Sequence, residues 1–184
     1  ALKSFGNGYR ALVIGASGAL GQAFCDALEA DPGCALVTRL SRNSSPSLDL
    51  EDAASIPRAA EAVAQHAPYH LIIVSSGLLH RPGIRPEKSL SALDADALQA
   101  VFQVNTLGPA LLLRDFLPLL DPQGAMALLS AKVGSIGDNR LGGWYAYRAS
   151  KAALNMLIKT ASIELARRAP RDAHVRTPAF GAPP

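Results

Sequence analysis

The 184-residue chain has only two cysteines, Cys25 and Cys34. Two cysteines cannot build the disulfide framework of a small secreted scaffold, and they do not make a zinc site. The histidines do not supply one either, because His66, His70 and His80 do not share a metal-ligand spacing. We therefore predict no metal centre, and we expect a protein of the reducing cytoplasm in which both cysteines are small buried side chains.

The chain also lacks a strong charge of either sign and has no long apolar run. Its formal net charge is +3 and its basic residues are scattered, so the composition does not indicate a nucleic-acid partner. No stretch approaches the roughly 20 uninterrupted apolar residues of a membrane-spanning helix, so we expect no membrane partner. With 49% hydrophobic and 18% charged residues the composition is globular, and the length fits one domain over residues 1–184.

What the chain does contain is a glycine-rich turn between a strand pattern and a helix pattern. Arg10 to Gly15 is a short, bulky apolar run, typical of a strand buried on both faces, and helix-forming residues follow from Gln22 to Ala30. Between them, Gly15, Gly18 and Gly21 are spaced G-x-x-G-x-x-G, one residue off the dinucleotide fingerprint. The first glycine can make the tight turn, the second lets a phosphate approach the backbone, and the third allows close helix–strand packing. For this element alone, a purely structural turn is the alternative.

The end of the next predicted strand, Cys34 to Leu40, is where a dinucleotide fold reads the adenosine ribose. Arg42 follows that strand with Arg39 and Ser41 near it, and the segment 32–48 contains no acidic residue. An arginine suits the 2′-phosphate of NADP(H), whereas an acidic residue would accept hydrogen bonds from the free 2′-hydroxyl of NAD(H). We therefore expect NADP(H) as the cofactor, the competing interpretation being a solvated loop arginine.

Apolar runs and helical patterns alternate along the rest of the chain. Further strands are predicted at 68–76, 124–130 and 172–175, and helices at 52–66, 93–120 and 149–168. This alternation predicts an α/β fold, a doubly wound parallel sheet of the Rossmann type between two helical layers. Ser76 and Gly77, at the end of one predicted strand, are small enough to let a ligand lie against the backbone.

Tyr147 and Lys151 stand four residues apart at the start of the last helical pattern, so they are expected on one helix face. An ammonium within ~4–6 Å of a phenol favours the phenolate. Lys151 is therefore expected to lower the pKa of Tyr147 and make it a proton donor for a carbonyl oxygen. An ordinary amphipathic helix with a solvated lysine is the alternative for this motif alone.

Pro109 interrupts the helical pattern 93–120. A proline inside a helix removes the hydrogen bond to the carbonyl four residues earlier, which here belongs to Asn105. We expect a kink at this place and an Asn105 carbonyl that is free to hold a water molecule or a side chain.

In this order, these pieces resemble the short-chain dehydrogenase/reductase family over Ala11 to about Arg168. The run from Gly134 to Asn155, with Gly-Ser-Ile-Gly-Asp-Asn and Gly-Gly-Trp-Tyr-Ala-Tyr-Arg-Ala-Ser-Lys, is similar to its C-factor and sniffer-like carbonyl reductase branch. The resemblance implies NADPH-dependent reduction of a small-molecule carbonyl substrate in a homodimer or homotetramer. The catalytic residues that it implies are Ser130, Tyr147, Lys151 and Asn105, the asparagine carbonyl holding a water linked to the lysine.

The resemblance also implies the cofactor-binding residues. They are Gly15, Ser17, Gly18, Ala19, Leu20, Gly21, Ser41, Arg42, Asp49, Leu50, Ser76, Gly77, Tyr147, Lys151 and Thr177. In this set Asp49 would hold the adenine amino group with Leu50 beside it, Lys151 would also bind the nicotinamide ribose, and Thr177 would contact the nicotinamide amide.

Two departures from the family pattern concern the site itself. Ser75 stands where the family usually has an asparagine that stabilises the sheet. Strict alignment on Gly134 puts Ala131 at the position of the substrate-orienting serine, so Ser135 is the alternative to Ser130.

A third departure concerns the carboxyl-terminal part of the fold, which we expect to be incomplete. The family has a strand, a Pro-Gly turn, a cofactor-covering segment and a final strand after the catalytic helix. Here a strand begins at about Asp172 and the chain ends at Pro184. Either the protein is truncated, or residues between Val175 and Arg176 are absent from the printed chain. Of the two, we expect a mobile lid to be missing there.

Two other functions remain open at this stage. A nucleotide-binding signalling or regulatory protein with little turnover would keep the pocket. The C-factor resemblance, Ala131 and the missing carboxyl-terminal elements favour it. An epimerase or dehydratase could use the same tyrosine and lysine. The paired Tyr147 and Lys151 favour the carbonyl reductase.

Overall fold

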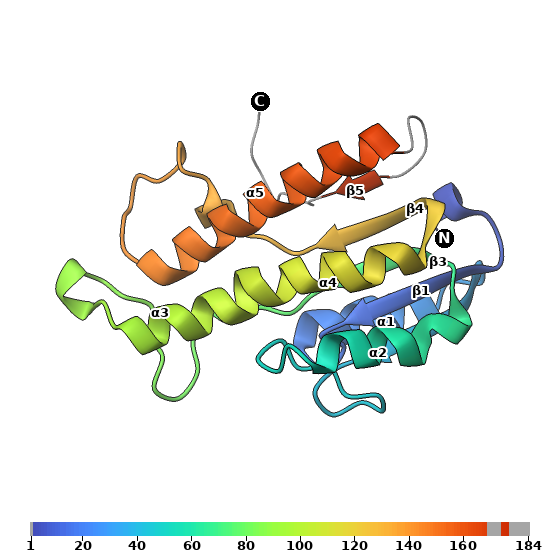
Figure 1. Cartoon of the computed structure of the whole chain (residues 1–184), viewed down its shortest axis with the longest axis horizontal. Coiled ribbons are helices and arrows are strands. Elements are labelled where there is room, and N and C mark those ends of the chain that lie inside the picture. Colours follow the sequence, from blue (N-terminus) through green and yellow to red (C-terminus); the bar gives the residue numbers. More distant parts are fainter. Residues whose placement is uncertain (1, 169–173, 177–184) are drawn as a thin grey trace.

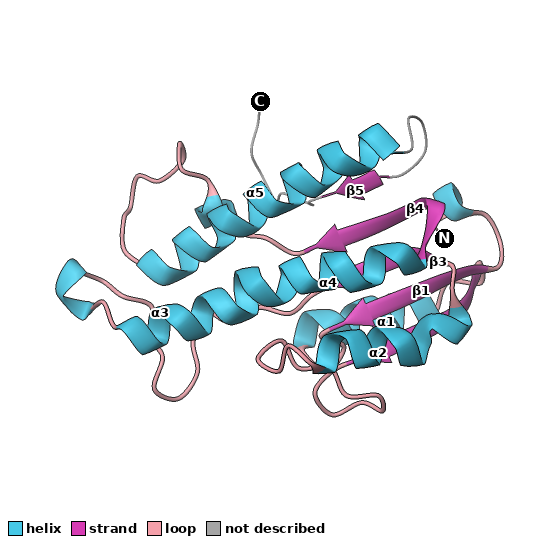
Figure 2. Ribbon diagram, viewed as in Figure 1, coloured by secondary structure: helices cyan, strands magenta, loops and turns pink. Residues whose placement is uncertain are grey.

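Five parallel strands form one sheet in the order β2-β1-β3-β4-β5 (Figures 1 and 2). The structure, a computed structural model, describes residues 2–168 and 174–176. The strands are β1 (Tyr9–Ile14), β2 (Cys34–Leu40), β3 (Tyr69–Val74), β4 (Leu120–Leu128) and β5 (His174–Arg176). The α-helices are α1 (Ala19–Glu29), α2 (Ser55–Val63), α3 (Ala95–Phe102), α4 (Gly108–Phe116) and α5 (Tyr145–Arg168). Short 3₁₀ turns lie at Lys3–Phe5, Ala64–His66, Leu90–Ala92, Leu117–Leu119 and Lys132–Gly134.

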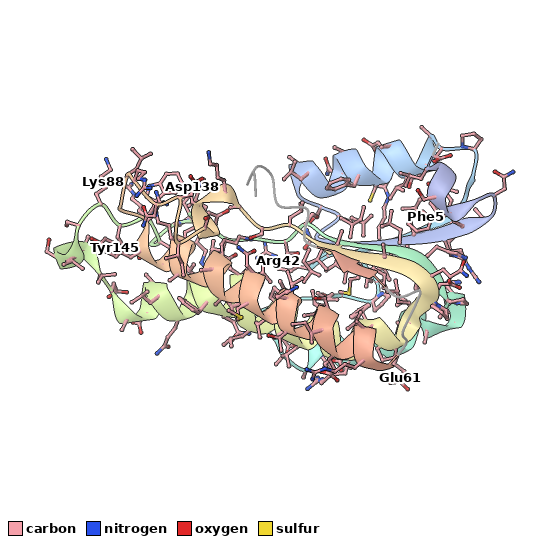
Figure 3. All side chains as sticks on the ribbon, turned by 90° about the horizontal axis from the view of Figure 1, so that it is seen from above. Phe5, Arg42, Glu61, Lys88, Asp138 and Tyr145 are labelled. Carbon is pink, nitrogen blue, oxygen red and sulfur yellow. The ribbon has the colours of Figure 1, made fainter. Side chains whose placement is uncertain are left out.

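Both faces of the sheet are covered by helices, as the apolar character of the strands predicts (Figure 3). Because side chains alternate along a strand, neighbouring residues belong to different cores. The core beneath α2, α4 and α5 takes Leu12, Ile14, Ile72, Val74, Met126 and Leu128 from the strands. The core beneath α1 takes Ala11, Val13, Leu71 and Ile73. The doubly wound α/β fold predicted from the sequence is confirmed.

The first three strands end level with one another, since Ile14 pairs with Leu40 on one side and with Val74 on the other. Parallel strands present all their carboxyl ends at one edge of a sheet, so the loops that follow them meet there. The amino-terminal part of α5 and the whole of α3 extend beyond this edge (Figure 1). These helices therefore reach past the ends of the strands.

The helical region around Pro109 is continuous, and it changes its helix type at the place where the kink was expected. A π-helical turn, Gln103–Leu107, joins α3 to α4, and Pro109 occupies the first turn of α4, where its missing N–H is least costly. Within the turn the Gly108 N–H donates to the Gln103 carbonyl, five residues earlier. The wider turn thus accommodates the proline without ending the helix.

Several predicted boundaries need correction. The helix expected from residue 149 begins at Tyr145, so Tyr147 and Lys151 both lie inside it. Val175 and Arg176 are consecutive residues of β5, which pairs with β4. The expectation of a lid missing between them stays a prediction. Among the residues that the structure describes, no helix is long and apolar enough to cross a membrane.

Candidate active site

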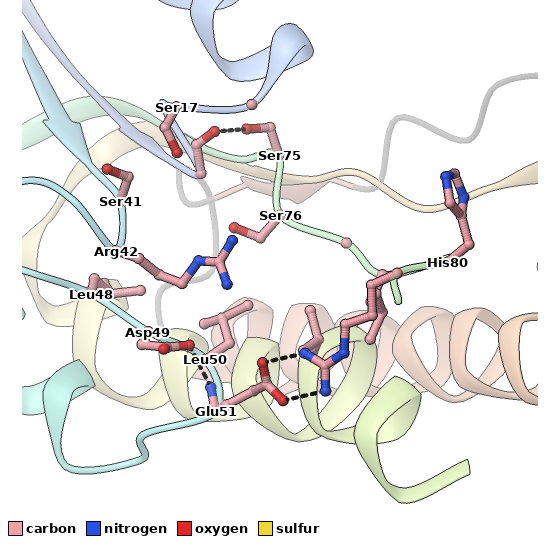
Figure 4. A pocket seen from close by; sticks show the side chains of 16 residues that line it. Ser17, Ser41, Arg42, Leu48, Asp49, Leu50, Glu51, Ser75, Ser76 and His80 are labelled. Carbon is pink, nitrogen blue, oxygen red and sulfur yellow. Dashed lines mark hydrogen bonds and ion pairs between the residues drawn. The ribbon is translucent and has the colours of Figure 1, made fainter. Parts of the chain in front are cut away.

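A cavity of ≈ 340 Å³ lies at the carboxyl ends of β1, β2 and β3 (Figure 4). It is lined by predicted cofactor residues from three separate segments, namely Gly15, Ser17, Gly18, Ser41, Arg42, Asp49, Leu50, Ser76 and Gly77. Leu48, Glu51, Ser75, Leu78, His80, Arg81 and Val104 complete the lining. The structure therefore brings together most of the residues predicted to bind the dinucleotide.

The glycine loop shapes the first wall of this cavity. Gly15 has a left-handed φ of +86°, and a Cβ there would stand 2.6 Å from the Ser76 hydroxyl oxygen. A Cβ on Gly21 would lie 2.1 Å from the Gly15 carbonyl oxygen, so α1 can approach β1 only because residue 21 is glycine. Gly18 is the N-cap of α1 and has room for a methyl group. Its lack of a side chain instead leaves the amino end of the helix open to an anion.

Ala19, Leu20 and Gly21 form the first turn of α1 and do not line the cavity. Their predicted role is therefore limited to the backbone N–H groups at the start of the helix, which can bind a phosphate group. The Leu20 side chain is 62% exposed.

Arg42 places a positive charge in the cavity. Its side chain extends from the end of β2 into the space between Ser76 and Asp49 (Figure 4). Arg39, expected nearby, points elsewhere: its Nη2 lies 2.7 Å from Glu29 and 3.6 Å from Asp26, both on α1. Arg39 lies within β2, and the alternation of side chains along this strand directs it toward α1. The interpretation of Arg39 as part of the ribose site is therefore wrong.

The loop after β2 forms the opposite wall. The Leu50 carbonyl accepts a hydrogen bond of 2.7 Å from the Gln103 side chain. Leu50 also packs closely on Gly108, because a Cβ added to Gly108 would lie 2.7 Å from the Leu50 Cβ. The Asp49 carboxylate accepts from the N–H of Glu51. Both predicted adenine-site residues are thus held by the backbone and by the π-helical region.

An ion pair that the sequence did not reveal borders the cavity. Glu51 and Arg81 form two parallel hydrogen bonds of 2.7 and 2.9 Å (Figure 4). The Arg81 guanidinium lowers the pKa of the Glu51 carboxyl. The two residues are 30 positions apart in loops, and no local pattern could have paired them.

Ser75 takes over part of the role of the asparagine that the family pattern expects. Its N–H donates to the Ile14 carbonyl at 2.9 Å, and its hydroxyl donates to the same carbonyl at 3.0 Å and to that of Gly15 at 3.3 Å. These bonds join the carboxyl end of β3 to the carboxyl end of β1. The glycine loop is therefore anchored to the neighbouring strand.

Tyr147 and Lys151 lie one turn apart on α5, with the Lys151 Nζ 5.8 Å from the centre of the Tyr147 ring. Lys151 is 3% exposed, and its ammonium donates to the Leu129 carbonyl at 3.0 Å. Burial lowers the pKa of Lys151 to about 8 and raises the pKa of Tyr147. The expected lowering of the tyrosine pKa is therefore wrong for this structure, because burial disfavours the charged form of both groups.

Gly77 connects this pair to the cavity. A Cβ on Gly77 would lie 3.5 Å from the Lys151 Nζ and 3.6 Å from the Asn105 Oδ1. Since Gly77 also lines the cavity, Lys151 and Asn105 lie next to that part of its lining.

Asn105 acts here through its side chain. Its Oδ1 accepts from the Leu78 N–H at 2.7 Å, and its Nδ2 donates to the Leu78 carbonyl at 2.8 Å and to the Ser150 hydroxyl at 3.1 Å. Asn105 is fully buried and lies in the π-helical turn. It thereby ties the loop after β3 to α5. The role expected for its carbonyl stays a prediction.

The serine assignment is less simple than the sequence pattern predicted. The Ser130 hydroxyl donates to the Asn155 Oδ1 at 2.6 Å. Asn155 is eight residues beyond Tyr147 on α5, about 12 Å along the helix axis. Ala131 is extended, so its side chain and that of Ser130 point in opposite directions. Ser135 follows the 3₁₀ turn that packs against Lys151.

Two further predictions concern Thr177 and metal binding. Thr177, expected to contact the nicotinamide amide, lies outside the described residues. In the part of the chain that the structure describes, no group of three histidine, cysteine or acidic side chains could hold a metal ion.

The fold and the site define a nucleotide-binding α/β protein whose cavity is lined by Gly77, next to the buried Lys151, with Tyr147 one turn away on α5. The chain belongs to the short-chain dehydrogenase family, whose model matches residues 9–177.

The curated relatives match shorter segments. A 1-hydroxy-2-glutathionyl-2-methyl-3-butene dehydrogenase from Rhodococcus is 38% identical over 80 residues, which are 44% of this chain and 35% of that protein. The C-signal of Myxococcus xanthus is 40% identical over 80 residues, 42% of this chain and 48% of that protein. The chain thus spans less than half the length of either relative.

Solved structures match almost the whole chain. The NADPH-bound carbonyl reductase from chicken fatty liver is 25% identical with a TM-score of 0.77, covering 89% of this chain and 73% of that one. The carbonyl reductase Sniffer of D. melanogaster is 23% identical with a TM-score of 0.75, covering 89% and 77%. The predicted family is confirmed. Its C-factor and sniffer-like branch stays a prediction.

Proposed function

We propose that the chain is an NADP(H)-dependent oxidoreductase that reduces a small-molecule carbonyl compound, and that residues 1–184 form one dinucleotide-binding domain. The observation that carries this proposal concerns Gly77, which lines the cavity that Arg42 enters. The buried Lys151 lies next to Gly77, and Tyr147 lies beside Lys151. The chicken and Drosophila structures named above are carbonyl reductases, the first of them NADPH-bound, which supports the same assignment.

The residues of the cavity fit NADP(H). A positively charged guanidinium reaches into the cavity next to two small residues, Ser41 and Ser76, as a 2′-phosphate would require. The amino end of α1 and the glycine loop would hold the pyrophosphate, and Asp49 with Leu50 the adenine. When bound there, the cofactor would supply the hydride for the carbonyl carbon.

The protein side of the reaction is a proton transfer. Burial keeps Tyr147 protonated at neutral pH, so its hydroxyl can donate to the developing alkoxide. Lys151, with a pKa of about 8, can carry a proton near neutral pH and lose it over a small pH range, which suits a group that replaces the proton of the tyrosine. The water at the Asn105 carbonyl belongs to the same proposal.

For contact with the substrate oxygen we keep Ser130 in the proposal, with Ser135 as the alternative. Ser130 would exchange its bond to Asn155 for one to the substrate. Replacing each serine by alanine and measuring kcat separately decides between the two positions.

The bond between Ser130 and Asn155 favours a second candidate function. If Ser130 keeps that bond, a protein that binds NADP(H) but turns over slowly is expected, in line with the likeness to the C-signal of Myxococcus xanthus.

Self-association also belongs to the proposal. Leu107, Met156 and Ile163 expose apolar side chains on the π-helical turn and α5, and we propose that a second copy of the chain covers them in a homodimer or homotetramer. Light scattering after size exclusion would reveal a monomer if this is wrong.

One experiment tests the proposed chemistry. The wild type and Tyr147→Phe are incubated with NADPH and a panel of aldehydes, ketones and quinones, and NADPH oxidation is followed. The wild type should turn over at least one compound, and the variant should lose turnover while still binding NADPH, because only the hydroxyl is removed. A wild type that binds NADPH but reduces nothing supports the regulatory function; a fully active variant contradicts the mechanism.

A further inference from the structure

Glu87 is a buried carboxylate that the proposed chemistry does not use. It lies in the loop between β3 and α3 and is 6% exposed. Its Oε2 accepts a hydrogen bond of 3.2 Å from the N–H of Ala146, in the first turn of α5, and its backbone carbonyl accepts from the N–H of Trp144. The first N–H groups of a helix have no partner within the helix, and a negative charge is favoured there. Glu87 therefore holds the start of the helix that carries Tyr147.

The turn into α5 is conformationally unfavourable. Gly142 and Gly143 have φ angles of +63° and +65°, and Trp144 follows with +54°. Trp144 is the one non-glycine residue with positive φ in the part of the chain that the structure describes. Two left-handed glycines are ordinary, but a bulky aromatic residue there needs support from its surroundings.

The surrounding contacts supply that support. The Trp144 N–H is bound to the Glu87 carbonyl, and the Trp144 carbonyl accepts from the Arg148 N–H at 2.9 Å as the first bond of α5. The Arg148 side chain donates to the Gly143 carbonyl at 2.9 Å. Figure 3 shows Lys88, the neighbour of Glu87, at the same end of the molecule as Tyr145. The two loops thus meet where the helix begins.

Trp144 in turn touches the proposed proton donor. The rings of Trp144 and Tyr147 meet edge to face, with centroids 6.3 Å apart and planes inclined at 75°. Such pairs favour a defined geometry in addition to burying surface. A change in the backbone of Trp144 would therefore change the orientation of the Tyr147 ring.

We propose that Glu87 is a positioning residue: its carboxylate, bound to the N–H of Ala146, holds the start of α5 and with it Trp144 in its left-handed conformation, and so fixes Tyr147 for proton transfer. The conformational part stands on the contacts alone, and the effect on turnover rests on the proposed function.

Trp144 is the only tryptophan in the chain, so its fluorescence reports on this turn. In Glu87→Ala the emission should shift to the red and acrylamide should quench it more strongly. The kcat should fall about tenfold or more through misplacement of Tyr147, while KM for NADPH stays within about twofold. Glu87→Gln keeps an acceptor oxygen and should restore most of both signals. Glu61→Ala, which removes an exposed glutamate on the distant α2 (Figure 3), should match the wild type.

A second background separates positioning from general support of the fold. Glycine adopts the left-handed region freely, so in Trp144→Gly the turn no longer depends on Glu87. Glu87→Ala should then lower kcat by a smaller factor in Trp144→Gly than in the wild type. Equal factors in the two backgrounds would overturn the proposal, as would unchanged Trp144 emission in Glu87→Ala. If the wild type reduces no carbonyl compound, the proposed function fails while the fluorescence of Glu87→Ala still decides whether Glu87 holds the turn.

Discussion

Replacing Lys151 by methionine should stabilise the unliganded protein at neutral pH and abolish its turnover. Burial lowers the pKa of Lys151 from 10.5 to about 8. Each pH unit of that difference corresponds to about 1.4 kcal/mol, so the charged form costs the folded state on the order of 3 kcal/mol. Methionine is of similar length and carries no charge, but it leaves the Leu129 carbonyl without its donor, a loss of about 1–2 kcal/mol. A net gain of about 1–2 kcal/mol is expected.

The pH dependence gives the sharper test. Below pH 8 the lysine is protonated in the folded and unfolded states, so the folded state bears the full free-energy cost of burying its charge. Between pH 8 and 10.5 the unfolded chain binds a proton that the folded chain has released, so stability rises with pH. From pH 7 to 9.5 the wild type should gain about 2 kcal/mol from Lys151, and Lys151→Met should not.

Equilibrium urea unfolding, followed by circular dichroism at pH 7 and 9.5, measures both effects. Burial also raises the pKa values of Tyr9, Tyr69 and Tyr147, which lowers stability as the unfolded tyrosines ionise near pH 10. Comparing the variant with the wild type removes that common contribution. Lys151→Arg is the control, because arginine keeps its charge over this range and should show no gain with pH. Equal pH dependence in the wild type and Lys151→Met would refute the assignment of a lowered lysine pKa.

Other replacements test the cofactor site. Arg42→Asp should reverse the preference for NADPH over NADH in binding titrations, and a wild type that prefers NADH would contradict the role of Arg42. Gly21→Ala should destabilise the protein by about 3 kcal/mol in urea unfolding, because its methyl group would overlap the Gly15 backbone. Gly18→Ala should change stability by less than about 1 kcal/mol, since its Cβ would be 3.5 Å from the Gly15 oxygen, yet weaken NADPH binding measured by titration. If Gly18→Ala binds NADPH as the wild type does, the phosphate does not approach the backbone there.

Local patterns predicted the parts of the molecule that neighbouring residues determine. The apolar run at β1 and the glycines after it specify a buried strand and a turn, and these are found where expected. The four-residue spacing of Tyr147 and Lys151 placed them on one helix without any knowledge of its partners. Such features follow from periodicity and from the needs of a tight turn.

Contacts between distant segments could not be predicted in this way. Arg39 lies as close in sequence to the ribose site as Arg42 does, but the pleat of β2 turns it to Glu29. The bonds from Ser130 to Asn155 and from Glu87 to Ala146 join segments 25 and 59 residues apart. The pKa of Tyr147 was misjudged for the same reason, since burial is set by the whole fold and outweighs one nearby lysine.

The π-helical turn at Gln103–Leu107 has a consequence for changes in chain length. Such a turn holds one residue more than an α-helical turn, and each residue rotates a helix by about 100°. With that extra residue, Val101 on α3 packs near Leu78 and Ala146, while Leu112 on α4 packs in the core beneath the sheet. A single-residue deletion here would preserve every helix propensity and still turn one of these two faces away from its partner. The helix should therefore not tolerate a change in its number of residues.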